Sequence, residues 1–170
     1  DLLGDAPAVP ASPVALPRQV AAFIEAVVCH RDPERYALLY SLVWRVLHGE
    51  RTLLEVSSDP LVHLLEMMRR SVARDLHGMR AALRFRRVEG EGGTERLVAW
   101  FEPEHFILEA TADFFVERFR SRVWSILTPD GSLHWDRERL AIGPPATRGQ
   151  APDGDAFEAG NMPETVAMAD

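Results

Sequence analysis

Apolar residues recur at helical spacing along the first half of the chain. Val20, Phe23 and Val27 share one side of a helix predicted over about 18–29, and a second series predicts a helix over about 33–48. A third, longer series begins at Asp59-Pro60, weakens at Gly78 and reaches about residue 83. Aspartate followed by proline indicates a helix start, because the carboxylate caps free amides and proline lacks one. Three helices are therefore expected before residue 84.

The second half alternates polar and apolar positions in four short stretches. These stretches are residues 84–89, 96–102, 123–128 and 132–136. The turn-rich sequence EGEGGT separates the first pair and Pro129-Asp130-Gly131 the second, which is typical of β-hairpins. Residues 103–120 have helical spacing, with Phe106 and Phe114 expected on the inner side. The pattern predicts an α+β fold, with three to four helices packed on a small antiparallel sheet made of two β-hairpins.

Composition divides the 170 residues into three segments. Residues 1–16 are rich in proline and are predicted to be a linker or a disordered lead-in. Residues 17–145 are predicted to form a single α+β domain, long enough to bury a sizeable core. Residues 146–170 are predicted to be an acidic tail that is disordered or altered.

Two features favour a cytoplasmic location. Cys29 is the single cysteine, so the chain forms no internal disulfide and a reducing compartment is the simplest setting. No stretch approaches the length of apolar sequence that a membrane-spanning helix needs, so no membrane contact is expected.

All 19 basic residues are arginine, which excludes Schiff-base lysine chemistry and a phosphate-loop lysine. The formal net charge of −7 hides a local excess of positive charge. Residues 69–87 contain seven arginines and one acidic residue, Asp75. A local basic surface can bind nucleic acid although the whole chain is acidic.

This arginine-rich segment predicts a surface that contacts nucleic-acid phosphates. Arg70, Arg74 and His77 lie at i, i+4 and i+7 on one helix face, and Arg84 and Arg86 alternate along the following strand. Trp135 is the tryptophan expected to be exposed and able to stack on a base. The alternative is a solvated helix face paired with nearby acids. The predicted nucleic-acid-binding residues are Arg70, Arg74, Arg80, Arg84, Arg86 and Trp135.

Several polar residues are candidates for catalysis. The candidates are Asp75, His77, Glu102, Glu104 and His105. Asp75 beside arginines is also typical of a structural ion pair, and Glu104 of a helix start. A divalent metal would be held by Glu104, His105, His134 and Asp136, whose residue types suit such ions. Their spacing matches no established metal motif, so no cofactor is predicted and a divalent metal is the alternative.

Several ordered blocks together resemble one bacterial family. The blocks include AWFEPEH at 99–105, FFVERF at 114–119 and WSILTPDG at 124–131, with others at 32–36, 59–60, 74–81, 84–86 and 134–136. They are similar to a family of DNA-repair-associated proteins, also described as DNA metabolism proteins, over about residues 20–145. Members are encoded beside a radical SAM protein, and some are fused to a uracil-DNA glycosylase domain.

The resemblance implies DNA as ligand, and a radical SAM protein or a uracil-DNA glycosylase domain as partner. It carries over no established catalytic residue. The positions that match the family blocks are Arg74, Asp75, His77, Arg80, Arg84, Glu102, Glu104, His105, Trp124, His134 and Asp136.

Three functional hypotheses follow. The leading one is a DNA-repair-associated domain that binds DNA through its arginine surface and acts with a partner enzyme. The second is a metal-assisted nucleic-acid hydrolase or base-processing enzyme. The third is a protein-interaction module whose arginine surface docks an acidic partner.

Overall fold

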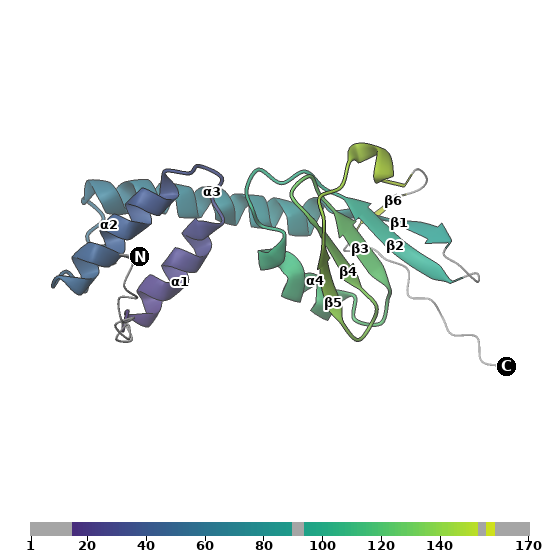
Figure 1. Ribbon diagram of the computed structural model, residues 1–170, viewed down its shortest axis with the longest axis horizontal. Helices are drawn as coiled ribbons and strands as arrows, with labels where there is room; N and C mark the ends of the chain where they lie inside the picture. Colours follow the sequence, from purple (N-terminus) through teal and green to yellow (C-terminus); the bar gives the residue numbers. More distant parts are fainter. Residues whose placement is uncertain (1–14, 90–93, 153–155, 159–170) are drawn as a thin grey trace, which may run out of the picture.

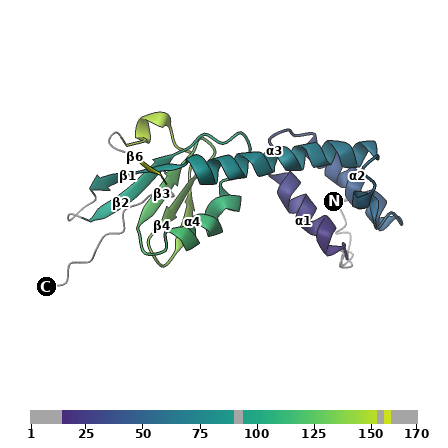
Figure 2. The ribbon, with the colours of Figure 1, turned by 180° about the vertical axis from the view of Figure 1, so that it is seen from behind.

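The molecule has a helical end and a sheet end joined by one long helix (Figures 1 and 2). The computed structural model describes residues 15–89, 94–152 and 156–158. At one end, α1 (Arg18–Val28) and α2 (Arg35–Leu47) pack against the first half of α3 (Pro60–Ala82). The second half of α3 continues to the sheet, where the short helix α4 (Ala112–Arg118) also lies. The three helices expected before residue 84 are thus confirmed.

The helical end has its own apolar core. Val20, Val27, Leu39, Leu42, Val46, Leu53, Val62 and Leu65 are buried in it together. Asp59 caps α3 by accepting hydrogen bonds from the backbone amides of Leu61 (2.9 Å) and Val62 (3.2 Å), as its sequence predicts. Gly49 follows the end of α2 with φ of 116°, a conformation that glycine adopts without a steric penalty.

The sheet has six strands in the order β5-β4-β3-β2-β1-β6. Their bounds are β1 Arg84–Glu89, β2 Glu95–Trp100, β3 Trp124–Leu127, β4 Ser132–Trp135, β5 Leu140–Gly143 and β6 Ala156–Glu158. The two predicted hairpins, β1–β2 and β3–β4, are both present and antiparallel. The α+β class is confirmed.

The sheet is mixed, whereas the sequence predicted an antiparallel one. Strands β2 and β3 pair in parallel, with Leu97 opposite Trp124 and Trp100 opposite Leu127. The chain leaves β2, passes through the 3-10 helix η3 (Glu109–Thr111) and α4, and returns to run beside β2 in the same direction. A connection of this length permits parallel pairing, which a tight turn does not.

One face of the sheet packs on α3 and α4. Phe85, Leu97, Ala99, Trp124, Ile126, Leu133 and Trp135 form a second core with Val72, Met79 and Leu83 of the α3 end and Phe115 of α4. Because side chains alternate along a strand, the residues between them point to the opposite side. We call that opposite side the open face.

The predicted helix over residues 103–120 is much shorter in the structure. Residues before η3 use their backbone amides in contacts with other elements, since His105 donates to Asp75 Oδ2 (2.8 Å) and Phe106 to the Cys29 carbonyl (2.8 Å). These bonds hold the segment in an irregular path. Phe106, expected on the inner side, is exposed.

Secondary structure continues beyond residue 145. The 3-10 helix η4 (Arg148–Gln150) follows β5, and β6 pairs with β1. Part of the tail predicted over 146–170 therefore contributes to the sheet. Residues 153–155 and 159–170 of this predicted tail, 1–14 of the predicted lead-in and 90–93 of the predicted turn lie outside the described residues.

Helix α3 runs through Gly78 without the predicted weakening. A Cβ atom at Gly78 would meet no atom within 4 Å outside its own helix, and its φ is not positive. Gly78→Ala is therefore expected to stabilise the protein by about 1 kcal/mol, since alanine favours the helix over glycine by that amount. Thermal unfolding is expected to show a rise in Tm of about 2–4 °C. A lower Tm would show that the site has less room than the structure indicates.

Candidate nucleic-acid interface

The open face carries positive charge and no acidic side chain within β1–β5. The strand register places there Arg84, Arg86 and Val88 of β1, Arg96, Val98 and Trp100 of β2, Ser125 and Leu127 of β3, Ser132 and His134 of β4, and Ala141 and Gly143 of β5. The acidic residues of β1 and β2, Glu89 and Glu95, alternate to the opposite side of the sheet from the open face. Arg84 and Arg86, two positions apart on β1, thus share one face of the sheet.

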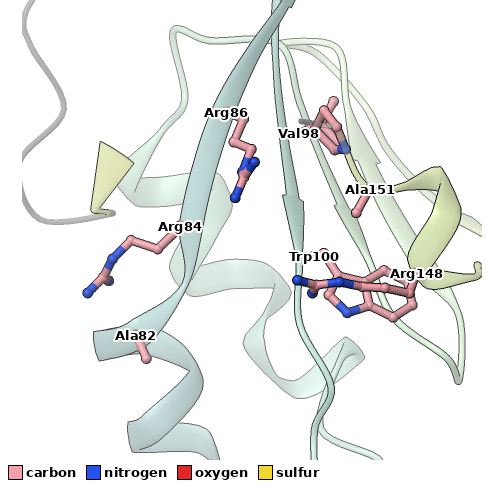
Figure 3. A pocket seen from close by; sticks show the side chains of 8 residues that line it. Ala82, Arg84, Arg86, Val98, Trp100, Arg148 and Ala151 are labelled. Carbon is pink, nitrogen blue, oxygen red and sulfur yellow. The ribbon is translucent and has the colours of Figure 1, made fainter. Parts of the chain in front are cut away.

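A pocket of about 280 Å³ lies on the open face, and we call it the Arg–Trp pocket. It is lined by Ala82, Arg84, Arg86, Val98, Trp100, Arg148, Ala151 and Pro152. Arg86 points from β1 toward the space bordered by Trp100 and Arg148 (Figure 3). Three of the eight lining residues are arginines and none is acidic. Such a pocket favours an anionic ligand with a flat apolar part.

The indole of Trp100 is held by contacts at its edge and face. Its Nε1 donates a hydrogen bond to Glu102 Oε1 at 2.8 Å, and the guanidinium of Arg148 lies 5.9 Å from the ring centroid. Arg148 reaches this position because the chain after β5 crosses back over the sheet, where Ala146 donates its amide to the Thr128 carbonyl (2.9 Å). The structure therefore brings β2 and η4 together at one aromatic ring.

Beside the pocket, the same face carries a polar row centred on His134. Ser125 Oγ lies 2.7 Å from His134 Nδ1, and Arg96 donates to both of these atoms, at 2.5 Å to the hydroxyl and 3.2 Å to the ring. On the other side of the ring, Nε2 lies 3.0 Å from Ser132 Oγ. Burial and then the charge of Arg96 lower the pKa of His134, so its neutral form is favoured.

The predicted arginines of α3 do not join the open face. Arg70 forms an ion pair with Glu66 at 2.9 Å, which corresponds to the alternative of a paired helix face. Arg74 donates to Ser71 Oγ at 3.4 Å. Arg80 lies over the Phe114 ring of α4 at 5.1 Å, and α4 covers the other face of the sheet.

The tryptophans differ from the sequence expectation. Trp135 is only 8% exposed and donates its Nε1 to the Arg120 carbonyl at 3.1 Å, so the expectation of an exposed Trp135 able to stack on a base is wrong. Trp135 lies on the same side of β4 as Leu133, and both side chains belong to the core beneath the sheet. Trp44 is 51% exposed on α2, and Trp100 is half-buried on the open face.

Asp75 and His105, two of the catalytic candidates, meet where the helical end joins the sheet end. Asp75 accepts the His105 backbone amide, and the His105 ring bridges Ser71 Oγ (2.9 Å from Nε2) and the Arg31 amide (3.2 Å from Nδ1). Since Nδ1 accepts from the Arg31 amide, Nε2 carries the proton and donates to Ser71. In this tautomer the ring has no free base nitrogen, and the cluster holds the two ends together.

The other candidates are not brought together. His77 is exposed on α3. The Glu102 carboxylate accepts the hydrogen bond from Trp100 Nε1. Glu104 is exposed, and its backbone carbonyl accepts a hydrogen bond from Arg31 Nε (2.8 Å). Asp136 caps a turn by accepting from the backbone amides of Glu138 and Arg139. Within the described part of the chain, no three histidine, cysteine, aspartate or glutamate side chains group as a metal site. The predicted set of Glu104, His105, His134 and Asp136 is thus dispersed.

His105 gives the fold a dependence on pH. Burial, followed by the neighbouring His30, lowers the pKa of His105 below its usual 6.5. As pH falls below 6.5, the unfolded chain takes up a proton that the folded protein resists, so stability decreases. His105→Gln is expected to lose stability at pH 8 and to show a smaller further loss at about pH 5.5 than the parent protein shows. Urea unfolding at the two pH values measures this, and an equal loss in both proteins would contradict it.

A comparison with protein families identifies the group to which this fold belongs. The model of a family described as a domain of unknown function, DUF4130, matches residues 33–159, most of the chain. The chain belongs to the DUF4130 family. The matched region of this DUF4130 protein includes α2, α3 and the whole sheet with β6. No curated protein matches the chain, and no solved structure does so. No helix of the described DUF4130 chain is both long and apolar enough to cross a membrane.

Three open-face residues of the DUF4130 protein were missed by the sequence analysis, namely Arg96, Trp100 and Arg148. The alternation of Arg96, Val98 and Trp100 was present in the sequence and could have indicated a second row beside Arg84 and Arg86. Arg148 gave no such signal, because its place depends on the path of the loop after β5.

Proposed function

We propose that this protein is a DNA-binding domain associated with DNA repair, which binds DNA through its open face and acts with a partner enzyme. The observation that carries the proposal is the Arg–Trp pocket, which is lined by Arg84, Arg86, Arg148 and Trp100 and by no acidic residue. Arginine forks bind phosphate oxygens bidentately, and an aromatic ring beside them offers a stacking surface.

The choice of DNA among anionic ligands rests on the family resemblance of the sequence. That resemblance also supplies the class of partner, a radical SAM protein or a uracil-DNA glycosylase domain. Binding is assigned to Arg84, Arg86, Arg96 and Arg148. Arg70, Arg74 and Arg80, which the sequence also suggested, are left out because they lie on α3, away from this face.

Fluorescence anisotropy with labelled DNA across a salt series tests the proposal. Four arginine–phosphate contacts to a single strand predict that log affinity falls with log salt concentration with a slope of about −3. A double-stranded probe of equal length and a uracil-containing probe are measured beside it. Absence of binding to every probe at low salt would contradict the proposal and would favour an acidic protein surface as the ligand of the arginines.

A further inference from the structure

We infer that the Arg–Trp pocket selects single-stranded DNA by holding one unpaired base against the indole of Trp100. This inference rests on the proposed DNA binding and names the form of DNA that the site takes. The base would lie between the Trp100 ring and the face of the Arg148 guanidinium, whose edge N–H groups would still contact a phosphate. Arg84 and Arg86 would bind the neighbouring phosphates.

The Trp100 ring is preorganised for stacking in the protein without DNA. It projects from the middle region of a six-stranded sheet rather than from a loop, and the hydrogen bond from Nε1 to Glu102 fixes its orientation. A rigid ring loses little conformational entropy when a base stacks on it. Among the four tryptophans, Trp124 and Trp135 are core residues and Trp44 lies at the far helical end. Trp100 is therefore the tryptophan that DNA on the open face can reach.

The position of Arg148 allows a base to stack between its guanidinium and the Trp100 indole. Stacked layers are separated by about 3.5 Å, so a base between the indole and the guanidinium requires about 7 Å. The present separation of 5.9 Å is short of this by about 1 Å. Arg148 is exposed on the short helix η4, and a small outward movement of its side chain admits the base. Guanidinium planes also stack on bases.

The size and walls of the pocket favour one base over a base pair. Its volume of about 280 Å³ lies just below the range of sites for drug-sized ligands. Ala82, Val98, Ala151 and Pro152 also line the pocket and supply its compact apolar walls. In a duplex both faces of each base are covered by its neighbours, so stacking on Trp100 first requires an unpaired, splayed base. Single-stranded DNA offers such a base at no pairing cost.

The test compares Trp100→Ala with Trp44→Ala, using a labelled oligothymidine and a duplex of equal length. We expect the parent protein to bind the single strand at least 10-fold more tightly than the duplex. Trp100→Ala is expected to weaken single-strand binding about 10-fold, the usual effect of one lost base stack, and to leave duplex binding unchanged. Trp44→Ala is expected to leave both affinities unchanged, and Trp100→Phe to retain most of the single-strand affinity.

The outcomes separate this inference from the proposed function. Salt-sensitive DNA binding that is equal for single strand and duplex in the parent protein, or a single-strand affinity that is unchanged in Trp100→Ala, overturns the base pocket and keeps the proposed function. Equal weakening of both probes by Trp100→Ala also overturns it, because a lost stack acts on the unpaired base alone. No binding of either probe at low salt overturns both. Circular dichroism of each variant confirms that it folds before its affinity is interpreted.

Discussion

Replacing Arg86 and Arg148 with glutamate is expected to weaken DNA binding at least 100-fold. Both side chains line the Arg–Trp pocket, from β1 and from η4. A hydrogen bond to a charged group contributes about 1.5 kcal/mol or more, so two lost contacts together exceed about 3 kcal/mol, and the new carboxylates add repulsion. Two fewer phosphate contacts also reduce the size of the salt slope by about 1.4 for a single strand.

A matched double variant shows whether position or total charge decides this result. Arg74→Glu with Arg118→Glu changes the net charge by the same amount on α3 and α4, which pack on the other face of the sheet. We expect it to lower affinity only slightly, through the long-range field, which salt screens. If both double variants lose affinity equally, DNA does not bind at the open face. Anisotropy at about 50 and 200 mM salt measures both quantities.

Truncation of Phe85 to alanine is expected to cause the largest loss of stability. Phe85 is fully buried, and its ring lies 5.2 Å from Phe119, 6.3 Å from Phe115 and 6.4 Å from Trp124, in edge-on geometry in each case. Phe→Ala in a core costs about 3–5 kcal/mol, which is a large part of the stability of an ordinary domain. Thermal unfolding is expected to show a fall in Tm of about 10 °C.

Leu64→Ala on α3 is the control for this substitution. Leu64 is 48% exposed, so its truncation removes little buried surface and creates no internal cavity. We expect a change in Tm of no more than about 2 °C. A Phe85→Ala protein as stable as the Leu64→Ala protein would show that the aromatic cluster beneath the sheet is not packed as described.

Local sequence signals predicted most of the elements of this fold. Asp59-Pro60 marks the start of α3 because the carboxylate satisfies amides within its own first turn. Pro129-Asp130-Gly131 joins β3 to β4 because the turn needs only neighbouring residues, with Thr128 Oγ1 accepting from the amides of Asp130 and Gly131 at 3.2 Å each. Such contacts are contained in a few consecutive residues, so a sequence pattern can indicate them.

Long-range contacts explain what the sequence did not predict. The parallel pairing of β2 with β3 and the addition of β6 beside β1 join segments far apart in the chain. The irregular path before η3 depends on Asp75 and Cys29, which belong to other elements. At the candidate site, the period of two along β1 placed Arg84 and Arg86 correctly, whereas Trp100 and Arg148 meet only through strand register and the returning loop.

Helix α3 contributes residues to both cores, so it fixes the distance between the helical end and the sheet end. Its 23 residues form a rod of about 34 Å, with Val62 and Leu65 in the helical core and Val72 and Met79 in the sheet core. A rod anchored by packing at both ends does not pivot freely. A protein that binds the helical end would therefore also fix the direction in which the Arg–Trp pocket faces. Docking of that protein and orientation of the pocket's ligand would then be coupled through α3.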